Sequence, residues 1–420
     1  MRTRQRTIIV ALAATTLLLA ACGRSDPGPG AGTGPESEPI ADGPATGTIT
    51  VWAMGTEGEA LGAFAEAFTA ENPEADVRVT PIPWDAAHER LATAIAADEV
   101  PDVAMIGTTW MGEFASTGGL DATPDLIDPS QFFEGAWGST VVGDTSYGVP
   151  WYVETRVLYV SAAPDTPAPA DWDELKAMAA GLQDAGATWG INLQPGQTGA
   201  WQTFLPFAWQ AGAQIVSDDG TQVTLDTPEF VRALEYYQSF FTEGLAPTDL
   251  PEGSLEPSFV DGDIGAFVSG PWHLGILADL GDEGYLDTIA VVPMPADQQQ
   301  ASFIGGANLA VFTSSGNRDS AWKFVEWLSQ PETQAEWYVA TSDLPAVPEA
   351  WESGTLATDA RLAMFGEQLE TAVAAPAIPN WEQIAGVIDT VLEQVAKTGL
   401  DPQEAATMMQ QQAEAIGTGL

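Results

Sequence analysis

Three side chains of complementary chemistry alternate along one short segment of this sequence. Tyr152, Glu154 and Arg156 occupy every second position within 147–160, a stretch whose composition predicts a strand. Alternate side chains of a strand share a face, so an acid and a base lie together beside an aromatic ring. Such a face can bind the hydroxyl groups of a ligand that rests on the ring, with Trp151 next to it as a further aromatic candidate. The alternative is a purely structural ion pair between the acid and the base.

Tryptophans at the ends of predicted strands are the next candidates for ligand contact. The chain contains 15 tryptophans, and most of them must serve packing, because tryptophan is a good core residue wherever its N–H finds a partner. Open α/β sheets, however, bind ligands beyond the carboxyl ends of their strands. Trp110 follows the buried strand predicted at 101–106, and we favour ligand contact for it. Glu57 follows the strand that ends at Trp52, but it is equally well explained as an acid in the first turn of a helix.

The first 22 residues have the pattern of an export signal. Three arginines precede an uncharged, largely apolar run at 8–21. This run has the length of a signal-peptide core and is shorter than the roughly 20 residues that span a bilayer. The small residues before Cys22 resemble the lipobox of bacterial lipoproteins. That resemblance implies removal of residues 1–21, lipidation of Cys22, and attachment to the outer face of the cytoplasmic membrane. An incidental cysteine beside an ordinary cleavage site is the alternative.

The composition excludes several classes of partner. The net charge is −46, and loss of residues 1–21 would leave 10 basic against 59 acidic residues, or −49. Nucleic acid and anionic lipid surfaces are therefore poor partners. A single cysteine permits no internal disulfide, and two histidines far apart make a zinc site improbable. We expect no metal and no cofactor, since the acidic stretches 218–220 and 261–263 are better explained as turns than as calcium loops.

Residues 22–46 are rich in Gly, Pro and small polar residues, which predicts a flexible tether. The body begins with strand, helix, strand, helix, strand at 48–52, 61–68, 76–79, 86–97 and 101–106, an order that predicts a parallel sheet with helices on its faces. A second α/β unit is predicted from the strand-like segments 147–160 and 264–268 and the helical segments 172–182 and 228–241. Late helices are predicted at 321–327, 333–338 and 381–398.

Several short motifs, in one order along nearly the whole mature chain, resemble the solute-binding proteins of sugar ABC importers, the family of the maltose- and trehalose-binding proteins. These motifs lie at 49–73, 101–103, 147–156, 169–175, 270–272, 305–308, 321–325 and 331–332. The resemblance implies a two-lobed α/β fold of the periplasmic-binding-protein type, each lobe a mainly parallel sheet flanked by helices, with strands crossing between the lobes. We place the first lobe at 47–153 and 303–345 and the second at 154–302 and 346–420.

The resemblance also implies the function and further site residues. The protein is expected to be a monomer that binds an oligosaccharide, a disaccharide in our interpretation, and delivers it to ABC permease subunits. Trp272 matches a tryptophan that relatives stack against sugar. Trp201, ahead of a predicted helix, and Gly305, Gly306 and Asn308, on a loop like one in the family, are the other candidates. Trp84 is interpreted as structural.

Two other classes of protein remain as alternatives at this point. A secreted carbohydrate hydrolase would also combine aromatic rings with two carboxylates, but nothing in the sequence resembles a hydrolase signature. A structural or adhesive surface lipoprotein would be repetitive or sandwich-like, whereas this chain alternates strands with helices and contains no repeats. Which sugar is bound depends on distances between aromatic and polar groups, and the sequence does not give them.

Overall fold

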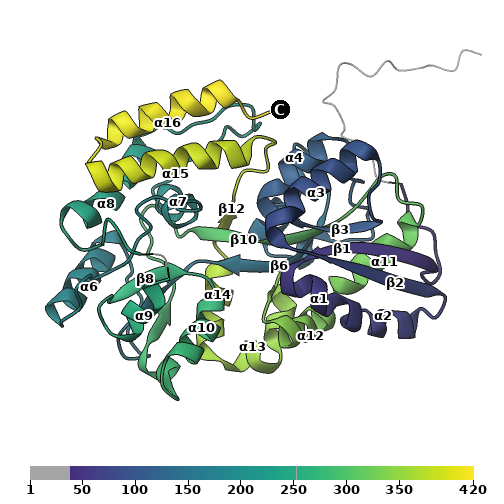
Figure 1. Ribbon diagram of the computed structural model, residues 1–420, viewed down its shortest axis with the longest axis horizontal. Coiled ribbons are helices and arrows are strands. Elements are labelled where there is room, and N and C mark those ends of the chain that lie inside the picture. The colour runs from purple at the N-terminus through teal and green to yellow at the C-terminus, as the bar shows by residue number, and fades with distance from the viewer. Residues whose placement is uncertain (1–37, 252) are drawn as a thin grey trace, which may run out of the picture. The chain divides into compact units, whose positions relative to one another are not determined.

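The first predicted unit forms one parallel layer with helices on both of its faces. The computed structural model describes residues 38–251 and 253–420; Cys22 and the predicted signal peptide lie outside them. The unit consists of β1 (Gly47–Met54), α1 (Gly55–Phe64), α2 (Glu66–Glu71), β2 (Ala75–Ile82), α3 (Trp84–Ala97) and β3 (Val103–Gly107). Strand β1 pairs in parallel with both β2 and β3, with α3 on one face and α1 and α2 on the other (Figure 1). The predicted βαβαβ order is confirmed.

Strands from distant parts of the chain complete this first sheet. They are β6 (Val149–Thr155), β10 (Ser302–Val311), β11 (Leu344–Pro345) and β12 (Ala372–Ala374), in the order β11-β6-β10-β3-β1-β2 with β12 paired to β10. Strand β10 runs antiparallel to its neighbours β3 and β6. The sheet is therefore mixed rather than mainly parallel, because a strand from late in the chain is inserted between two earlier ones.

A second sheet has three strands, β7 (Val157–Val160), β8 (Ala266–Ser269) and β9 (Ala290–Val292), and both of its pairings are antiparallel. The prediction of a mainly parallel sheet in each lobe is wrong here, since local periodicity carries no information on the direction in which distant strands meet. Arg156 is the single residue between β6 and β7, so the chain passes from the first sheet to the second there.

The buried apolar side chains form two clusters, and the second sheet contributes residues to both of them. One cluster surrounds most of the first sheet and one face of the second, and the other extends from the opposite face of the second sheet to α7 (Trp201–Gln210), α8 (Pro228–Thr242), α15 (Trp381–Thr398) and α16 (Pro402–Ile416). Helices α15 and α16 pack against each other and against α8 (Figure 1). The two-lobed α/β architecture expected from the sequence is thus confirmed.

The remaining elements are short strands, single turns and helices that cover the two sheets. They are η1 (Thr108–Trp110), α4 (Met111–Ser116), η2 (Pro129–Gln131), α5 (Glu134–Gly138), β4 (Val141–Val142), β5 (Thr145–Ser146), α6 (Trp172–Asp184), α7 (Trp201–Gln210), α8 (Pro228–Thr242), α9 (Leu255–Val260), α10 (Trp272–Leu280), η3 (Tyr285–Thr288), α11 (Arg318–Leu328), α12 (Pro331–Thr341), η4 (Pro348–Glu352), α13 (Gly354–Thr358), α14 (Ala360–Leu369), α15 (Trp381–Thr398) and α16 (Pro402–Ile416).

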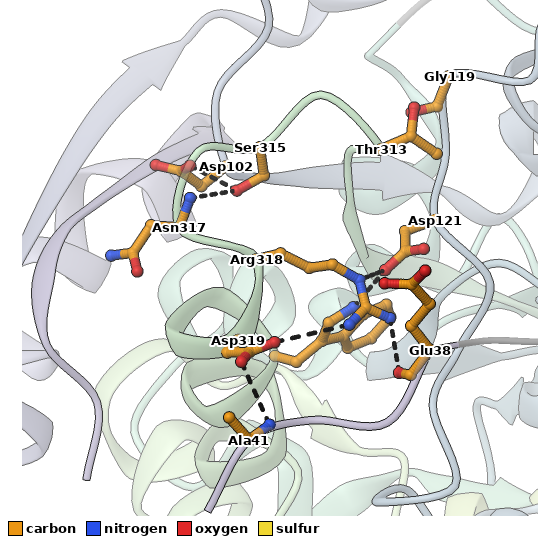
Figure 2. Close-up of polar contacts among 11 residues, drawn as sticks. Glu38, Ala41, Asp102, Gly119, Asp121, Thr313, Ser315, Asn317, Arg318 and Asp319 are labelled. Carbon is orange, nitrogen blue, oxygen red and sulfur yellow. Dashed lines mark hydrogen bonds and ion pairs between the residues drawn. The ribbon is translucent and has the colours of Figure 1, made fainter. Parts of the chain in front are cut away.

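The segment 38–46, which we call the N-terminal strap, is attached to the start of α11. Arg318 donates from Nη2 to the carbonyl of Glu38 (3.0 Å) and pairs through Nε with Asp121 (2.5 Å). Asp319 accepts from the amide of Ala41 at 3.2 Å, as Figure 2 shows. The end of the predicted tether that lies within the described residues therefore contacts the body of the protein.

Candidate functional site

A pocket of about 330 Å³ opens at the carboxyl end of β3, between the two hydrophobic clusters. The lining residues are Trp84, Gly107, Thr108, Thr109, Trp110, Tyr152, Glu154, Gln202, Phe303, Gly305 and Gly306. They come from α3, the β3–η1 junction, β6, α7 and β10. Aromatic rings and paired polar groups thus converge here from elements that are distant in sequence.

Two larger pockets lie elsewhere and lack this chemistry. One, of about 580 Å³, is next to α14 and β9 and has no aromatic side chain in its lining; its cation, Arg361, is paired with Asp359. The other, of about 450 Å³, lies along α3, where the Arg90 guanidinium is 4.4 Å from the centre of the Trp52 ring. Size alone does not identify a binding site, whereas a few convergent polar groups beside aromatic rings are typical of one.

Two tryptophans form the aromatic wall of the smaller pocket. Trp110 lies in η1, directly after β3, and Trp84 is the first residue of α3. Their rings meet edge to face at 5.7 Å, and His88 supports Trp110 from behind at 5.2 Å. Trp84 keeps 38% of its surface exposed. Trp84, which the sequence analysis interpreted as structural, thus lies in the lining of the pocket.

The polar side of the pocket is built on β6. Glu154 lines the pocket, and its Oε1 accepts from Nη1 of Arg156 at 3.3 Å. Arg156 is buried and also donates from Nη2 to the amide oxygen of Gln202. Its guanidinium lies over the rings of Trp272 (4.8 Å) and Phe303 (5.1 Å). The ion pair between Glu154 and Arg156 is therefore present, and the charge of Arg156 is balanced by a carboxylate of the pocket.

Three carboxyl groups surround Tyr152, which lines the pocket next to Glu154. Burial, followed by the charges of Glu57, Asp343 and Glu154, raises the pKa of the Tyr152 hydroxyl well above its usual range. Burial and then the neighbouring Glu57 carboxylate raise the pKa of Asp343 to about 7. At neutral pH Tyr152 therefore keeps its proton and can donate a hydrogen bond, while Asp343 is about half protonated.

The two glycines of β10 are explained by close packing of the backbone. A Cβ atom on Gly305 would lie 2.8 Å from Oε1 of Glu154, and one on Gly306 would lie 2.2 Å from the carbonyl oxygen of Tyr152. Gly306 also has a φ of +120°, which residues with a side chain rarely adopt. Gly305 and Gly306 belong to a strand and not to the loop that the sequence suggested, and they allow β10 to lie flat against β6.

Several predicted residues lie outside the lining. Trp151 is buried on the other face of β6, stacked on Trp337 at 4.8 Å, because neighbouring strand residues alternate between faces. Asn308 is fully buried in β10 and hydrogen-bonds with Ser139, so direct ligand contact from Trp151 or Asn308 is contradicted. Glu57 is buried behind Tyr152.

Trp201 and Trp272 flank the pocket without lining it. Trp201 is buried edge-on against Phe303, with 5.2 Å between the ring centres. Trp272 begins α10 and is 41% exposed, separated from the pocket by Arg156. Because so much of Trp272 is exposed, it is not a core residue of the protein.

Gln202, Phe303, Thr108 and Thr109 line the pocket and were not anticipated. Gln202 follows a predicted tryptophan at the start of a helix, and Phe303 is two positions before Gly305 on the same face of β10. Strand alternation would have indicated Phe303 if this segment had been recognised as a strand.

Within the described residues, no group of three or more His, Cys, Asp or Glu is arranged to hold a metal ion. The two histidines instead hydrogen-bond to carboxylates, His88 to Glu113 at 2.9 Å and His273 to Glu256 at 3.0 Å. Each histidine therefore serves as a hydrogen-bond partner of a carboxylate. No helix in the described part of the chain combines the length and the apolar character needed to cross a membrane.

Two lobes joined by a strand that crosses between their sheets, with a pocket of aromatic and paired polar groups where they meet, define a ligand-binding protein of the periplasmic type. A family model described as bacterial extracellular solute-binding protein matches residues 63–364. The chain belongs to this family, whose members bind solutes outside the cytoplasm and are not enzymes.

The sequences and structures of several known proteins match this chain over most of their length, which supports the assignment to this family. The sugar-binding protein MalE from the phytopathogen Xanthomonas citri is 32% identical, with 88% of this chain and 97% of that chain covered and a TM-score of 0.82. The diacetylchitobiose-binding protein DasA of Streptomyces coelicolor is 28% identical, with 96% of each chain covered. The GacH receptor of Streptomyces glaucescens, solved without ligand and with acarbose, is 26% identical, with 88% and 98% covered and a TM-score of 0.73.

Proposed function

We propose that this protein is the membrane-anchored receptor of an ABC sugar importer and that it binds a disaccharide in the pocket between its lobes. The observation that carries the proposal is the pairing of the Trp84–Trp110 wall with the hydrogen-bonding side formed by Tyr152, Glu154 and Gln202. A pyranose has apolar C–H faces and a rim of hydroxyls, so it needs both kinds of surface. The names of relatives, which include a sugar-binding, a diacetylchitobiose-binding and a maltotriose-binding protein, support the same class of ligand.

The charges near the pocket favour an uncharged sugar. Arg156 is buried and paired with Glu154, and none of the described residues that line the pocket is Lys, Arg or His. A phosphate or carboxylate on the ligand would face the Glu154 carboxylate without a compensating cation in that lining. We therefore expect neutral saccharides to bind and sugar phosphates or uronates to be rejected.

The division into lobes and the contact residues follow from the same proposal. We assign 47–153 and 303–345 to the first lobe and 154–302 and 346–420 to the second; membership of β7, β8 and β9 in a separate sheet supports this, although β12 pairs with the first sheet. Of the residues predicted from the sequence, the proposed direct contacts are Trp110, Tyr152, Glu154, Gly305 and Gly306. Trp84 and Gln202, which also line the pocket, join them.

Arg156, Trp201, Glu57 and Trp272 act from behind or beside these contact residues. Lobe closure on the sugar and transfer to permease subunits complete the proposed cycle.

The anchor is proposed from the sequence alone. Cys22 lies outside the described residues, at the junction that resembles a lipobox. Lipidation there would hold the receptor, as a monomer, at the outer face of the cytoplasmic membrane.

A thermal-shift screen of the protein from residue 22 onward tests the ligand class. The panel is trehalose, maltose, cellobiose, chitobiose and a glycerol glucoside, with glucose 6-phosphate and glucuronate as charged controls. A ligand at 100 times its Kd stabilises the folded state by about 2.7 kcal/mol, so a true ligand raises Tm measurably. Tyr152→Phe, which removes one hydroxyl of the pocket, should weaken the response to that sugar.

Two results would count against the proposal. If no neutral saccharide shifts Tm while a charged control does, the ligand class is wrong. Release of monosaccharide from a bound disaccharide would instead favour the hydrolase, the alternative function that the family assignment does not support.

A further inference from the structure

A buried carboxylate on the penultimate helix holds the loop that leads into the pocket. Asp389 lies in α15 and is only 9% exposed. Its Oδ2 accepts from the amide of Gly199 and its Oδ1 from the amide of Trp201, both at 2.8 Å. Trp201 is the first residue of α7 and Gly199 lies just before its N-cap residue, Ala200, which makes no capping hydrogen bond through a side chain. Asp389 therefore supplies the helix cap from a distant part of the chain.

The capped turn leads directly to the pocket. Trp201 is wedged between Phe303, which lines the pocket, and Trp381 at the start of α15, with ring centres 5.2 and 5.1 Å away. The next residue, Gln202, lines the pocket and accepts from Arg156. A change at Asp389 would therefore alter the positions of two lining residues, Phe303 and Gln202, through the first turn of α7.

The loop before α7 has an unusual backbone conformation and packs closely against α15. Gly196, Gln197 and Gly199 all have positive φ values, of 136°, 86° and 87°. A Cβ atom on Gly196 would lie 2.4 Å from the Cβ of Glu393, one turn beyond Asp389. A conformation of this kind persists only where the surroundings determine it. The Asp389 carboxylate contributes by binding the amide of Gly199 at the end of the loop.

We propose that Asp389 is a positioning residue of the sugar site, which fixes α7 so that Gln202 faces the pocket and accepts its hydrogen bond from Arg156. This rests on the proposed function above, because it assigns Asp389 a part in binding the sugar. The carboxylate does not touch the ligand. It acts through the orientation of Gln202, and α15 thereby becomes part of the binding machinery.

The test compares Asp389→Ala with a matched variant, Gln410→Ala. Gln410 is also buried (8% exposed) on a C-terminal helix and also holds backbone groups, the amide of Leu225 (2.6 Å) and the carbonyl of Val223 (2.8 Å), none of which lines the pocket. Both variants should lower Tm by a comparable few degrees. Only Asp389→Ala should raise the Kd, by tenfold or more, for whichever of maltose, trehalose, cellobiose or chitobiose stabilises the wild type.

Two further measurements separate positioning from general loss of stability. Without ligand, the amides of residues 199–204 should exchange hydrogen faster in Asp389→Ala, while those of 223–225 exchange faster in Gln410→Ala. In a double-mutant cycle, Asp389→Ala should weaken binding less than threefold when Gln202→Ala is already present, because the two act through one contact. Asp389→Asn, which keeps the size and one acceptor, provides an intermediate if the alanine variant does not fold.

The outcomes distinguish this inference from the function on which it rests. A wild-type protein that binds none of the four sugars refutes the proposed function. Wild-type binding with an unchanged Kd in both Asp389 variants overturns the positioning role. So does an equal loss of affinity in Gln410→Ala, or additivity of the Asp389 and Gln202 changes.

Discussion

Replacing Trp272 by alanine tests whether an exposed ring beside the pocket contributes to binding. The ring packs over Gly270, where a Cβ atom would lie 2.0 Å from it, and the Arg156 guanidinium is 4.8 Å from its centre. With 41% of the residue exposed, its removal cannot cost the roughly 3–5 kcal/mol that a fully buried Trp→Ala change costs. We expect a loss of about 1–2 kcal/mol in unfolding free energy, from partial apolar burial and one cation–π contact.

The expected loss in binding is larger than the loss in stability. Trp272 flanks the pocket in this structure, and the proposed lobe closure would bring the sugar onto its exposed ring. A tryptophan that is covered by ligand in this way behaves as a hot spot, so truncation should cost about 2 kcal/mol or more. This corresponds to an increase in Kd of about thirtyfold. Trp272→Phe keeps a ring and should recover part of the affinity.

Calorimetric titration and urea unfolding on the same preparations measure the two losses. Ile276→Ala is the control, since Ile276 is 38% exposed one turn further along α10 and does not line the pocket. Its Kd should match that of the wild type. A folded Trp272→Ala protein that binds sugar like the wild type would refute the platform role, and it would weaken every contact that was assigned by resemblance.

Four further outcomes are expected. The pKa of Asp343 is raised from 3.8 to about 7 in the folded protein. Between about pH 4 and 7 the folded protein therefore keeps a proton on this carboxyl that the unfolded chain releases. As a result, the contribution of Asp343 to the free energy of unfolding falls as the pH rises through that range. Asp343→Asn should remove that part of the slope in urea unfolding, and parallel wild-type and mutant profiles would refute the assignment. Cys22→Ser should release the protein from membranes at unchanged sugar affinity; unaltered membrane fractionation would exclude the anchor. Saturating sugar should reduce the radius of gyration in small-angle scattering, and identical radii would contradict lobe closure. Arg318→Ala should speed proteolysis within the N-terminal strap without changing the Kd, and an unchanged cleavage rate would show that this arginine does not hold the strap.

Local sequence patterns predicted the local parts of the fold. The β1–α1–β2–α3–β3 order follows from alternating and helical spacing, and Trp110 was correctly expected just after a buried strand. The insertion of β10 between β3 and β6 was not predicted, because the pairing joins residues about 150–200 positions apart and no short-range pattern encodes it. For the same reason Asn308 was interpreted as a loop residue although it is a buried strand residue.

The site was predicted best where alternation along one strand decides which side chains meet. Tyr152 and Glu154 share a face and both line the pocket, and the same rule places Trp151 on the opposite face, where it packs on Trp337. Gln202 required knowledge of how α7 is held against β10 and α15, which depends on contacts between distant parts of the chain.

The position of Arg156 explains how the two lobes could be coupled to one ligand. It is the single residue between β6, which belongs to the first sheet, and β7, which belongs to the second. From there it pairs with Glu154 on β6, donates to Gln202 on α7 and lies over Trp272 on α10. A rotation of one sheet against the other must change at least one of these contacts, because Glu154 lies on the first sheet whereas Trp272 follows β8 of the second sheet. A sugar that binds Glu154 and Gln202 together would favour the arrangement in which both face the pocket, and its differential affinity for that arrangement would provide the free energy for closure.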